Sequence, residues 1–285
     1  MPFANEDQAE FWGKSESGAK WLTYEDQMDD LLSPVLDLVL DRAALQPGMR
    51  VLDIGCGTGA SAVQAAQIVG ANGHVLAADI SQPFLDRAAE RAATEGVEHT
   101  RFQLADAQVH AFEQSDRDAM ISRFGVMFFD DTVAAFANMA RALKPGGQMT
   151  FAAWGPLDDN PWFKAPHALA CARLGKPPQV DRNAPGPLAF HDRGRVSGLL
   201  AQAGLTNIRV EPVPLFLRVR GSIQDCAALC TRIGPAARVI AHFDGTKQDV
   251  QAIRAAVAQE FQPYASFDAV RIPAVINLFQ ANRAA

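Results

Sequence analysis

The sequence predicts an α/β fold with a doubly wound, mostly parallel sheet that has helices on both faces. The first observation is a short apolar run at residues 51–54, the pattern of a strand buried on both faces of a parallel sheet. The second is a glycine at every second position immediately after it, at 55, 57 and 59. The third is an alanine-rich segment without a helix breaker at 60–69. Strand, glycine turn and helix form the nucleotide-binding opening of a doubly wound domain.

The glycines suit a backbone that a ligand approaches closely, with turn residues at positive φ. The run G-C-G-T-G-A also fits the looser dinucleotide fingerprint G-x-G-x-x-A, so the glycines alone do not identify the ligand. Asp53 lies inside the strand just before them, where a carboxylate would crowd a pyrophosphate. The carboxylate favours a cationic ligand instead.

Residues 51–59, Val-Leu-Asp-Ile-Gly-Cys-Gly-Thr-Gly, resemble the first motif of the class I S-adenosylmethionine (SAM)-dependent methyltransferases. The sulfonium and amino group of SAM would supply the positive charge. Leu143-Lys144-Pro145-Gly146-Gly147 matches a turn that the family uses before its fifth strand. The resemblance implies a seven-stranded Rossmann-like methyltransferase sheet whose last strand is reversed. It is specific over residues 48–154 and general elsewhere.

The cofactor residues follow from the carboxyl ends of successive strands, where ligands of open parallel sheets bind. Asp79 ends the second strand 20 residues past Gly59, the distance at which a carboxylate meets a ribose hydroxyl pair. In the resembled family an Asp at the position of Asp106 accepts from the adenine amino group. The alternatives are a surface helix cap for Asp79 and a turn residue for Asp106. The predicted cofactor-binding residues are Asp53, Gly55, Cys56, Gly57, Asp79, Ile80, Asp106, Ala107 and Arg123.

The other elements follow from hydrophobic periodicity, capping residues and breakers. Ser33-Pro34 is expected to kink or restart the first long helix, and Ser81 to cap the helix that follows the second strand. Strands are predicted at 74–79, 100–104, 118–122, 148–154, 205–212, 215–219 and 272–280. Helices are predicted at 28–44, 84–96, 131–143, 165–174, 193–203, 223–233, 235–242 and 248–261.

Four regions are expected around this layout. They are an N-terminal helical cap (1–47), the SAM-binding core (48–154), an inserted lid (155–191) and a C-terminal part with acceptor-side helices (192–285). The inserted segment is too long for a simple connection and is rich in aromatic residues. The candidate acceptor pocket consists of Phe124, Phe128, Trp154, Trp162 and His167. Core packing is the alternative for each of them.

The acceptor class is inferred from the segment after the fourth strand. Family members that methylate nitrogens of nucleic acids and proteins often carry Asn or Asp followed by Pro-Pro-aromatic, where this chain has Ser122-Arg123-Phe124-Gly125. We therefore expect a small, fairly apolar or aromatic acceptor, with the methylated atom open. A general base is needed only when the acceptor must lose a proton. His167, His191, His242 and Tyr264 are considered, but the catalytic residues are left unassigned.

Composition bounds the remaining expectations. The 285 residues have a net charge of −6 and no long basic run, which argues against a nucleic-acid partner. The sequence has no signal-peptide pattern and no apolar run that would span a membrane, so a cytoplasmic enzyme is expected. It has no C-x-x-C pair, and no metal is expected. The oligomeric state is left undetermined. SAM is the expected cofactor and S-adenosyl-L-homocysteine (SAH) the product. The alternatives are an NAD(P)-dependent oxidoreductase and a non-catalytic SAM-binding protein.

Overall fold

A computed structural model describes residues 3–285, so residues 1 and 2 of the expected cap lie outside the described part. Seven strands form one sheet in the order β3-β2-β1-β4-β5-β7-β6. The strands are β1 (Arg50–Ile54), β2 (His74–Asp79), β3 (Thr100–Leu104), β4 (Arg117–Arg123), β5 (Leu143–Trp154), β6 (Leu205–Arg220) and β7 (Ala269–Arg283). The α-helices are α1 (Glu6–Lys14), α2 (Glu16–Thr23), α3 (Glu25–Ala43), α4 (Ala60–Val69), α5 (Gln82–Thr94), α6 (Thr132–Ala142), α7 (Pro161–Leu174), α8 (Arg193–Gln202), α9 (Ile223–Cys230), α10 (Pro235–His242) and α11 (Lys247–Phe261).

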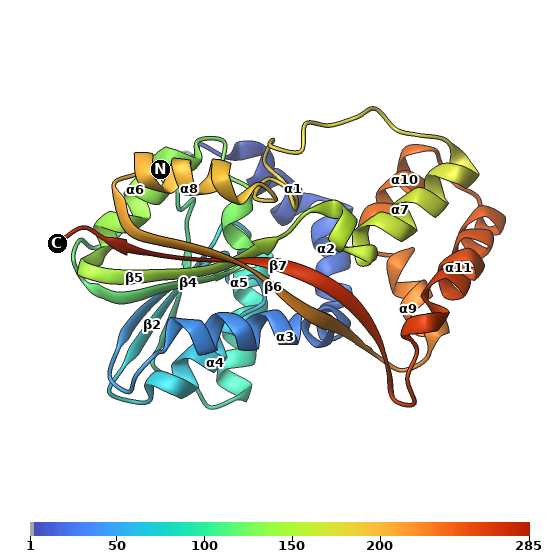
Figure 1. The fold of residues 1–285 in the computed structure, drawn as a ribbon. Helices are drawn as coiled ribbons and strands as arrows, with labels where there is room; N and C mark the ends of the chain where they lie inside the picture. The colour runs from blue at the N-terminus through green and yellow to red at the C-terminus, as the bar shows by residue number, and fades with distance from the viewer. Residues whose placement is uncertain (1–2) are drawn as a thin grey trace.

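The helices form two layers and a separate group. α3 and α4 lie on one face of the sheet, and α6 and α8 lie on the other (Figure 1). α7, α9, α10 and α11 pack against one another beyond the end of the sheet; we call these four helices the helical lobe (Figure 1). α1 and α2 lie between the lobe and the core (Figure 1). The predicted α/β sheet with helices on both faces is therefore confirmed.

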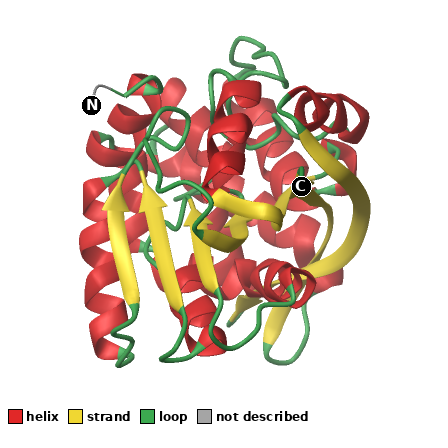
Figure 2. Ribbon diagram, turned by 90° about the vertical axis from the view of Figure 1, so that its left-hand side faces the viewer, coloured by secondary structure: helices red, strands yellow, loops and turns green. Residues whose placement is uncertain are grey.

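The sheet has the predicted strand directions. β1 pairs in parallel with both β2 and β4, and β7 runs antiparallel to both β5 and β6. The strand arrows at the left of Figure 2 point the same way, with loops at their tips. The carboxyl ends of β1, β2, β3 and β4 thus meet at one edge, which brings the segments after Ile54, Asp79, Leu104 and Arg123 together.

The predicted restart of the helix at Ser33-Pro34 is wrong, because α3 continues through Pro34. A proline in a helix interior removes a hydrogen bond and crowds the preceding turn. Here Leu32 and Val35 beside it are buried to 2% and 0% exposure, and α3 packs on β4, β5 and β6. Burial of this apolar face outweighs the local cost of the proline.

The predicted strands 205–212 and 215–219 form a single strand, β6. Pro212 and Pro214 both pair within it, opposite Asn277 and Val275 of β7. β6 is the edge strand, and residues two apart direct their backbone nitrogens to the same side. Proline is tolerated where that side is the free edge, so the two prolines do not interrupt the strand.

Several element boundaries also differ, for example those of β7, which runs from Ala269 to Arg283 where 272–280 is predicted. The predicted turn at 143–147 lies inside β5, where the pairing with β4 shifts between Leu143 and Gln148 and Gly146 has a φ of 76°. The turn is therefore a bulge in the strand. The helix predicted at 165–174 already begins at Pro161, and the helix predicted to end at 233 ends at Cys230.

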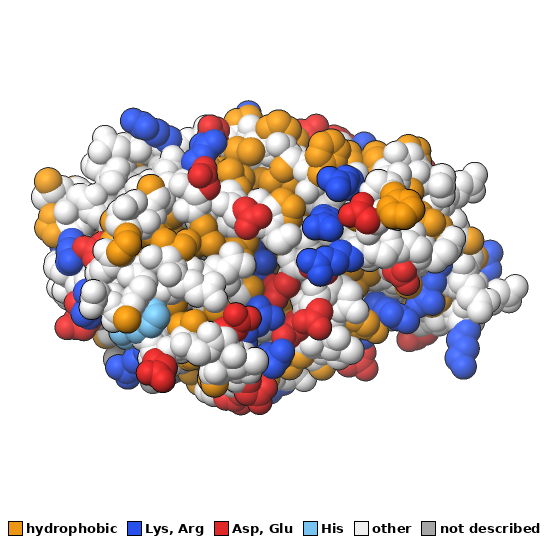
Figure 3. All heavy atoms as spheres, turned by 90° about the horizontal axis from the view of Figure 1, so that it is seen from below, with side chains coloured by type: hydrophobic (Ala, Val, Ile, Leu, Met, Phe, Trp, Pro, Cys, Tyr) orange, Lys and Arg blue, Asp and Glu red, His pale blue; other side chains and the backbone are white. Residues whose placement is uncertain are grey.

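Charged side chains of both signs are interspersed on the face of the molecule that Figure 3 shows. None of the helices within residues 3–285 combines the length and the apolar character that crossing a bilayer requires.

Phe151 is the centre of the core between β5, β7 and α6. Its side chain has 0% exposure and stacks on Phe279 with ring centroids 4.9 Å apart. Phe136 lies 5.1 Å away and Phe190 6.2 Å away. This cluster attaches the reversed strand to the parallel half of the sheet.

We predict that Phe151→Ala lowers the free energy of unfolding by about 3–5 kcal/mol, because it removes a fully buried ring and leaves a cavity. Phe216→Ala on β6 is the control, since that ring is 60% exposed and its loss should change stability by less than about 0.5 kcal/mol. Urea unfolding followed by circular dichroism measures both. Equal midpoints for the two variants would contradict the assigned role of the cluster.

Candidate cofactor and acceptor site

The three glycines after β1 serve different purposes. All have positive φ, 66° at Gly55, 55° at Gly57 and 90° at Gly59. A Cβ on Gly55 would lie 2.5 Å from the Cα of Gly125, so the loops after β1 and β4 pack backbone against backbone. A Cβ on Gly59 would lie 2.8 Å from Ala88 of α5, whereas one on Gly57 would meet open space. Gly57 is therefore the point where a ligand can approach the loop.

Asp53 is fully buried at the end of β1, and only one of its oxygens is satisfied. Ser61 Oγ donates to Oδ2 at 2.6 Å, while Oδ1 has no hydrogen-bond partner among residues 3–285. Burial raises the pKa of Asp53 to about 7, although the Ser61 hydrogen bond and the charge of Arg123 act in the opposite direction. A buried carboxylate oxygen without a partner is costly and suits a positively charged ligand group.

Arg123, at the end of β4, supplies the complementary charge. Its Nη2 donates to Asp29 Oδ1 of α3 at 3.0 Å, and its buried Nη1 has no partner among the described residues. Asp53 and Arg123 therefore each keep one buried polar atom free beside the glycine loop. The ammonium and carboxylate of an amino acid, the end group of SAM, match these two atoms in charge.

Asp79 lies at the end of β2, beside the glycine loop. Its Oδ2 accepts from Gly57 N at 2.8 Å and its Oδ1 from Ser81 N at 2.9 Å. Each carboxylate oxygen has a second lone pair, so both remain able to accept from a hydroxyl pair. Burial raises the pKa of Asp79 to about 6. The predicted cap role of Ser81 is wrong: its hydroxyl donates to the carbonyl of Trp12 at 3.0 Å and makes no cap bond to α5.

Asp106, which follows β3, is already occupied by the N-terminal segment. Its Oδ2 accepts from the backbone nitrogens of Ala4 (2.8 Å) and Asn5 (2.9 Å), and its Oδ1 from Asn5 Nδ2 (2.8 Å) and Gln108 N (3.0 Å). The proposed adenine contact of Asp106 therefore competes with residues 4 and 5. The sequence analysis missed Asn5, and no local pattern identifies a residue whose partner is 101 positions away.

The other predicted cofactor residues lie around these carboxylates. Ile80 is half-buried next to Asp79, and the carbonyl of Ala107 accepts from Asn138 Nδ2 at 2.9 Å. Cys56 is 3% exposed, and burial raises the pKa of its thiol well above the usual range. Cys56 is thus a neutral thiol in the wall of the loop.

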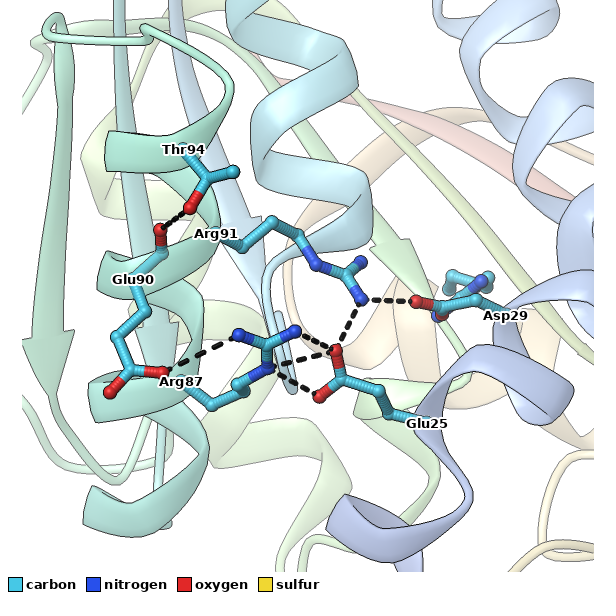
Figure 4. A network of polar contacts seen from close by, with 7 residues as sticks. Glu25, Asp29, Arg87, Glu90, Arg91 and Thr94 are labelled. Atoms are coloured by element: carbon cyan, nitrogen blue, oxygen red, sulfur yellow. Dashed lines mark hydrogen bonds and ion pairs between the residues drawn. The ribbon is translucent and has the colours of Figure 1, made fainter.

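Ion pairs connect Arg123 to the helices at its side. Arg91 of α5 contacts Asp29 Oδ2 at 2.7 Å and Glu25 Oε1 at 2.9 Å, and Arg87 contacts Glu25 Oε1 at 2.7 Å (Figure 4). Burial raises the pKa of Glu25, but hydrogen bonds from Arg87 and Arg91 outweigh it and hold the pKa below its usual value. The start of α3, the face of α5 and the end of β4 are thereby fixed together.

Two predicted acceptor residues stack at the carboxyl ends of β4 and β5. Phe124, with a φ of 67°, lies parallel to Trp154 with centroids 4.5 Å apart. Phe163 at the start of α7 meets the edge of Trp154 at 4.7 Å. Phe128 lies elsewhere, 5.6 Å from Trp12 of α1.

Trp162 and His167 belong to α7 in the helical lobe. Trp162 is 3% exposed. His167 Nε2 lies 3.5 Å from Cys171 Sγ, and burial lowers the pKa of the imidazole. The structure thus does not place the five predicted acceptor residues in a single contact group, and the lobe has to supply the rest of any pocket.

A cavity of about 360 Å³ lies between α2 and α10, and the sequence analysis did not predict it. The Arg232 guanidinium lies over the Tyr24 ring, 5.4 Å from its centroid. The signal for it in the sequence is the group of aromatic residues near the N-terminus, Phe11, Trp12, Trp21 and Tyr24. The lining consists of Lys20, Tyr24, Thr231, Arg232, Ala237, Ile240, Ala241, Asp244 and Gly245.

None of the candidate bases is joined to the glycine loop by a hydrogen bond among residues 3–285. His191 Nδ1 lies 2.8 Å from the carbonyl of Leu188, His242 packs on Phe243 and Tyr264 packs on Phe261. The base therefore stays unassigned.

Comparison with known proteins supplies the family context. Residues 51–147 match the family model described as a methyltransferase domain. An uncharacterised protein of Mycobacterium tuberculosis is 33% identical over 126 residues, which is 44% of each chain, so the match spans less than half the length of that relative. Nocamycin O-methyltransferase of Saccharothrix syringae is 30% identical over 203 residues, covering 66% of this chain and 70% of the relative. Among solved structures, the SAM complex of phosphoethanolamine N-methyltransferase 2 from Haemonchus contortus has the same fold, with a TM-score of 0.54, 19% identity and coverage of 88% of this chain and 53% of that one.

We predict that Glu25→Gln destabilises the protein by about 1.5–3 kcal/mol, the scale of a hydrogen bond to a charged group, because the neutral amide no longer offers Arg87 and Arg91 a shared carboxylate. Glu90→Gln is the matched control. Glu90 also contacts Arg87, at 3.4 Å, but its side chain is 71% exposed, so its loss should cost less than about 1 kcal/mol. Chemical denaturation measures both, and a loss for Glu90→Gln as large as that for Glu25→Gln would refute the structural role of Glu25.

The raised pKa of Asp53 predicts a pH dependence of stability. The folded protein holds a proton on Asp53 up to about pH 7, whereas the unfolded chain releases it near its usual value of 3.8. Stability from this group is therefore fully present below about pH 4 and lost as the pH rises to 7. Asp53→Asn should flatten the decline in melting temperature between pH 5 and 7, and Asp37→Asn, at an exposed position on α3, should leave it unchanged. If the melting temperatures of wild type and Asp53→Asn changed with pH in parallel, the prediction that Asp53 is protonated in the folded protein would be excluded.

Proposed function

The chain belongs to the class I SAM-dependent methyltransferases, and we propose that it transfers the methyl group of SAM to a small, fairly apolar or aromatic acceptor and releases SAH. The relative named nocamycin O-methyltransferase supports a small-molecule acceptor. Family membership disfavours the alternative of a nicotinamide-dependent oxidoreductase.

The observation that carries the proposal is the pair of free buried atoms beside the glycine loop, Asp53 Oδ1 and Arg123 Nη1. A buried acceptor and a buried donor of opposite charge fit the ammonium and the carboxylate of the methionine end of SAM. Gly57 leaves room for close approach, and Asp79 keeps lone pairs for the ribose hydroxyls. The proposed cofactor set is Asp53, Gly55, Cys56, Gly57, Asp79, Ile80, Asp106, Ala107 and Arg123.

The chain contributes orientation and exclusion of water. SAM supplies a methyl group on a positively charged sulfur, a good leaving group. Asp53, Arg123 and Asp79 would hold the cofactor at both ends, and a held geometry converts a bimolecular encounter into an effectively unimolecular step. Phe124 and Trp154 would present apolar rings at the carboxyl ends of β4 and β5. An acceptor that arrives already ionised needs no general base, which is consistent with the absence of an assigned one.

The acceptor side combines three regions. The residues that we propose to contact the acceptor remain Phe124, Phe128, Trp154, Trp162 and His167. Residues 155–191 are proposed as the lid and 1–47 as the cap over the core at 48–154. The helices within 192–285, together with α7, would complete the pocket and set acceptor choice.

Isothermal titration of the full chain with SAM and with SAH tests the proposal directly. We expect binding of both, and a folded protein that binds neither would refute it. Thermal protection by NADPH but not by SAM would favour the oxidoreductase instead. Incubation with methyl-labelled SAM and a panel of quinols, phenols and amines then tests catalysis, since label transfer to any acceptor excludes a purely SAM-binding protein.

We predict that Asp79→Ala weakens SAM binding by about 1–3 kcal/mol, the scale of hydrogen bonds to a charged group. Asp86→Ala on α5 serves as the control, because Asp86 is exposed and accepts only from Gln82. Titration calorimetry on both variants gives the difference. Unchanged affinity in Asp79→Ala would remove the ribose assignment.

A further inference from the structure

The N-terminal segment fills most of the hydrogen-bonding capacity of the Asp106 carboxylate, and Gln108 fills the rest. Ala4 and Asn5 provide three of its four donors, and Gln108 N provides the fourth. An ionised carboxylate offers about four lone-pair positions, so none is left for another donor. Asn5 is 2% exposed and Asp106 is 3% exposed, which makes this a buried contact.

Asn5 makes this contact in place of capping its own helix. Asparagine is among the preferred N-cap residues, yet the Asn5 side chain makes no cap bond to α1. Its Nδ2 donates to Asp106 Oδ1 at 2.8 Å and Gln108 Oε1 at 3.2 Å, and its Oδ1 accepts from Asp130 N at 2.8 Å. The side chain thus fastens the N-terminal segment to the loops after β3 and β4.

Asp106 lies beside the proposed ribose contact. β2 and β3 are neighbours in the sheet, and Ala105 N donates to the carbonyl of Asp79 at 2.9 Å. A nucleoside whose sugar hydroxyls bind Asp79 therefore has its base near Asp106. The amide N–H groups of Asn5 occupy the acceptor that the exocyclic amino group of adenine would need.

We propose that Asn5 is a positioning residue that competes with the amino group of the cofactor's base for Asp106, so that residues 4 and 5 must leave Asp106 before the nucleoside binds there. This inference rests on the proposed function. Only molecules in which the segment is released can then bind the ligand in this way. The apparent affinity therefore equals the intrinsic affinity multiplied by the fraction of such molecules. Weakening the segment should tighten the binding of any ligand that uses Asp106.

The test uses the full chain carrying Asn5→Ala, titrated with SAH and with the purine-riboside analogue of SAH, whose base has neither the amino group nor an N1–H donor. Asn5→Ala should lower the Kd for SAH about tenfold, the upper end of the range for one typical net hydrogen bond. The Kd for the purine-riboside analogue should stay unchanged, because that base has no donor to place on Asp106. A general loosening of the fold would change both ligands alike and would overturn the proposal.

Glu6→Ala is the matched control, since Glu6 is adjacent and exposed, and its side chain makes no hydrogen bond or ion pair among the described residues. Its SAH affinity should equal that of wild type. A weaker SAH affinity in Asn5→Ala would also overturn the proposal, because the segment would then belong to the bound site. Failure of wild type and all variants to bind SAH would refute the proposed function itself, and this inference with it.

Hydrogen exchange provides a second readout that does not depend on a variant. The backbone amides of Ala4 and Asn5 donate to Asp106, so SAH should accelerate their exchange in the wild-type protein. Slower exchange at these amides on adding SAH would contradict release of the segment.

Discussion

The buried Asp53 carboxylate is the constraint on which the rest of the site depends. A carboxyl group with 0% exposure at the end of a central strand needs compensation when it ionises, and Ser61 provides only one hydrogen bond. Arg123 provides the nearest positive charge and is itself held by Asp29. Asp29 in turn contacts Arg91. The electrostatics of the glycine loop are therefore linked through ion pairs to α3 and α5, outside the loop.

The N-terminal segment and α1 are held by contacts with residues that follow β2, β3 and β4 at the same edge of the sheet. Trp12 accepts from Ser81 through its carbonyl, and its ring packs on Phe84 and Phe128. Asn5 is bonded to Asp106. The N-terminal segment is thus attached to Asp106, one of the residues proposed to bind the cofactor, so the position of the segment and cofactor binding are expected to be thermodynamically coupled.

The helical lobe lies outside the residues that match the methyltransferase domain. The matched methyltransferase domain ends at residue 147, before α7 begins. The cavity between α2 and α10 combines an apolar wall with the cations Lys20 and Arg232. We therefore expect the core to hold the cofactor, and acceptor choice to depend on the N-terminal helices and the helical lobe.

The sequence by itself determined the parallel half of the sheet, the glycine loop and the carboxylates at the strand ends. The strands follow from local apolar runs. The glycine loop and the carboxylates follow from residue types whose spacing is typical of a nucleotide-binding turn. Only the tertiary structure decided that Pro34 stays within a helix, that Pro212 and Pro214 lie in one edge strand, and that Asn5 binds Asp106. Each of these outcomes depends on packing or pairing with distant segments, and the energy of such contacts outweighs local propensity.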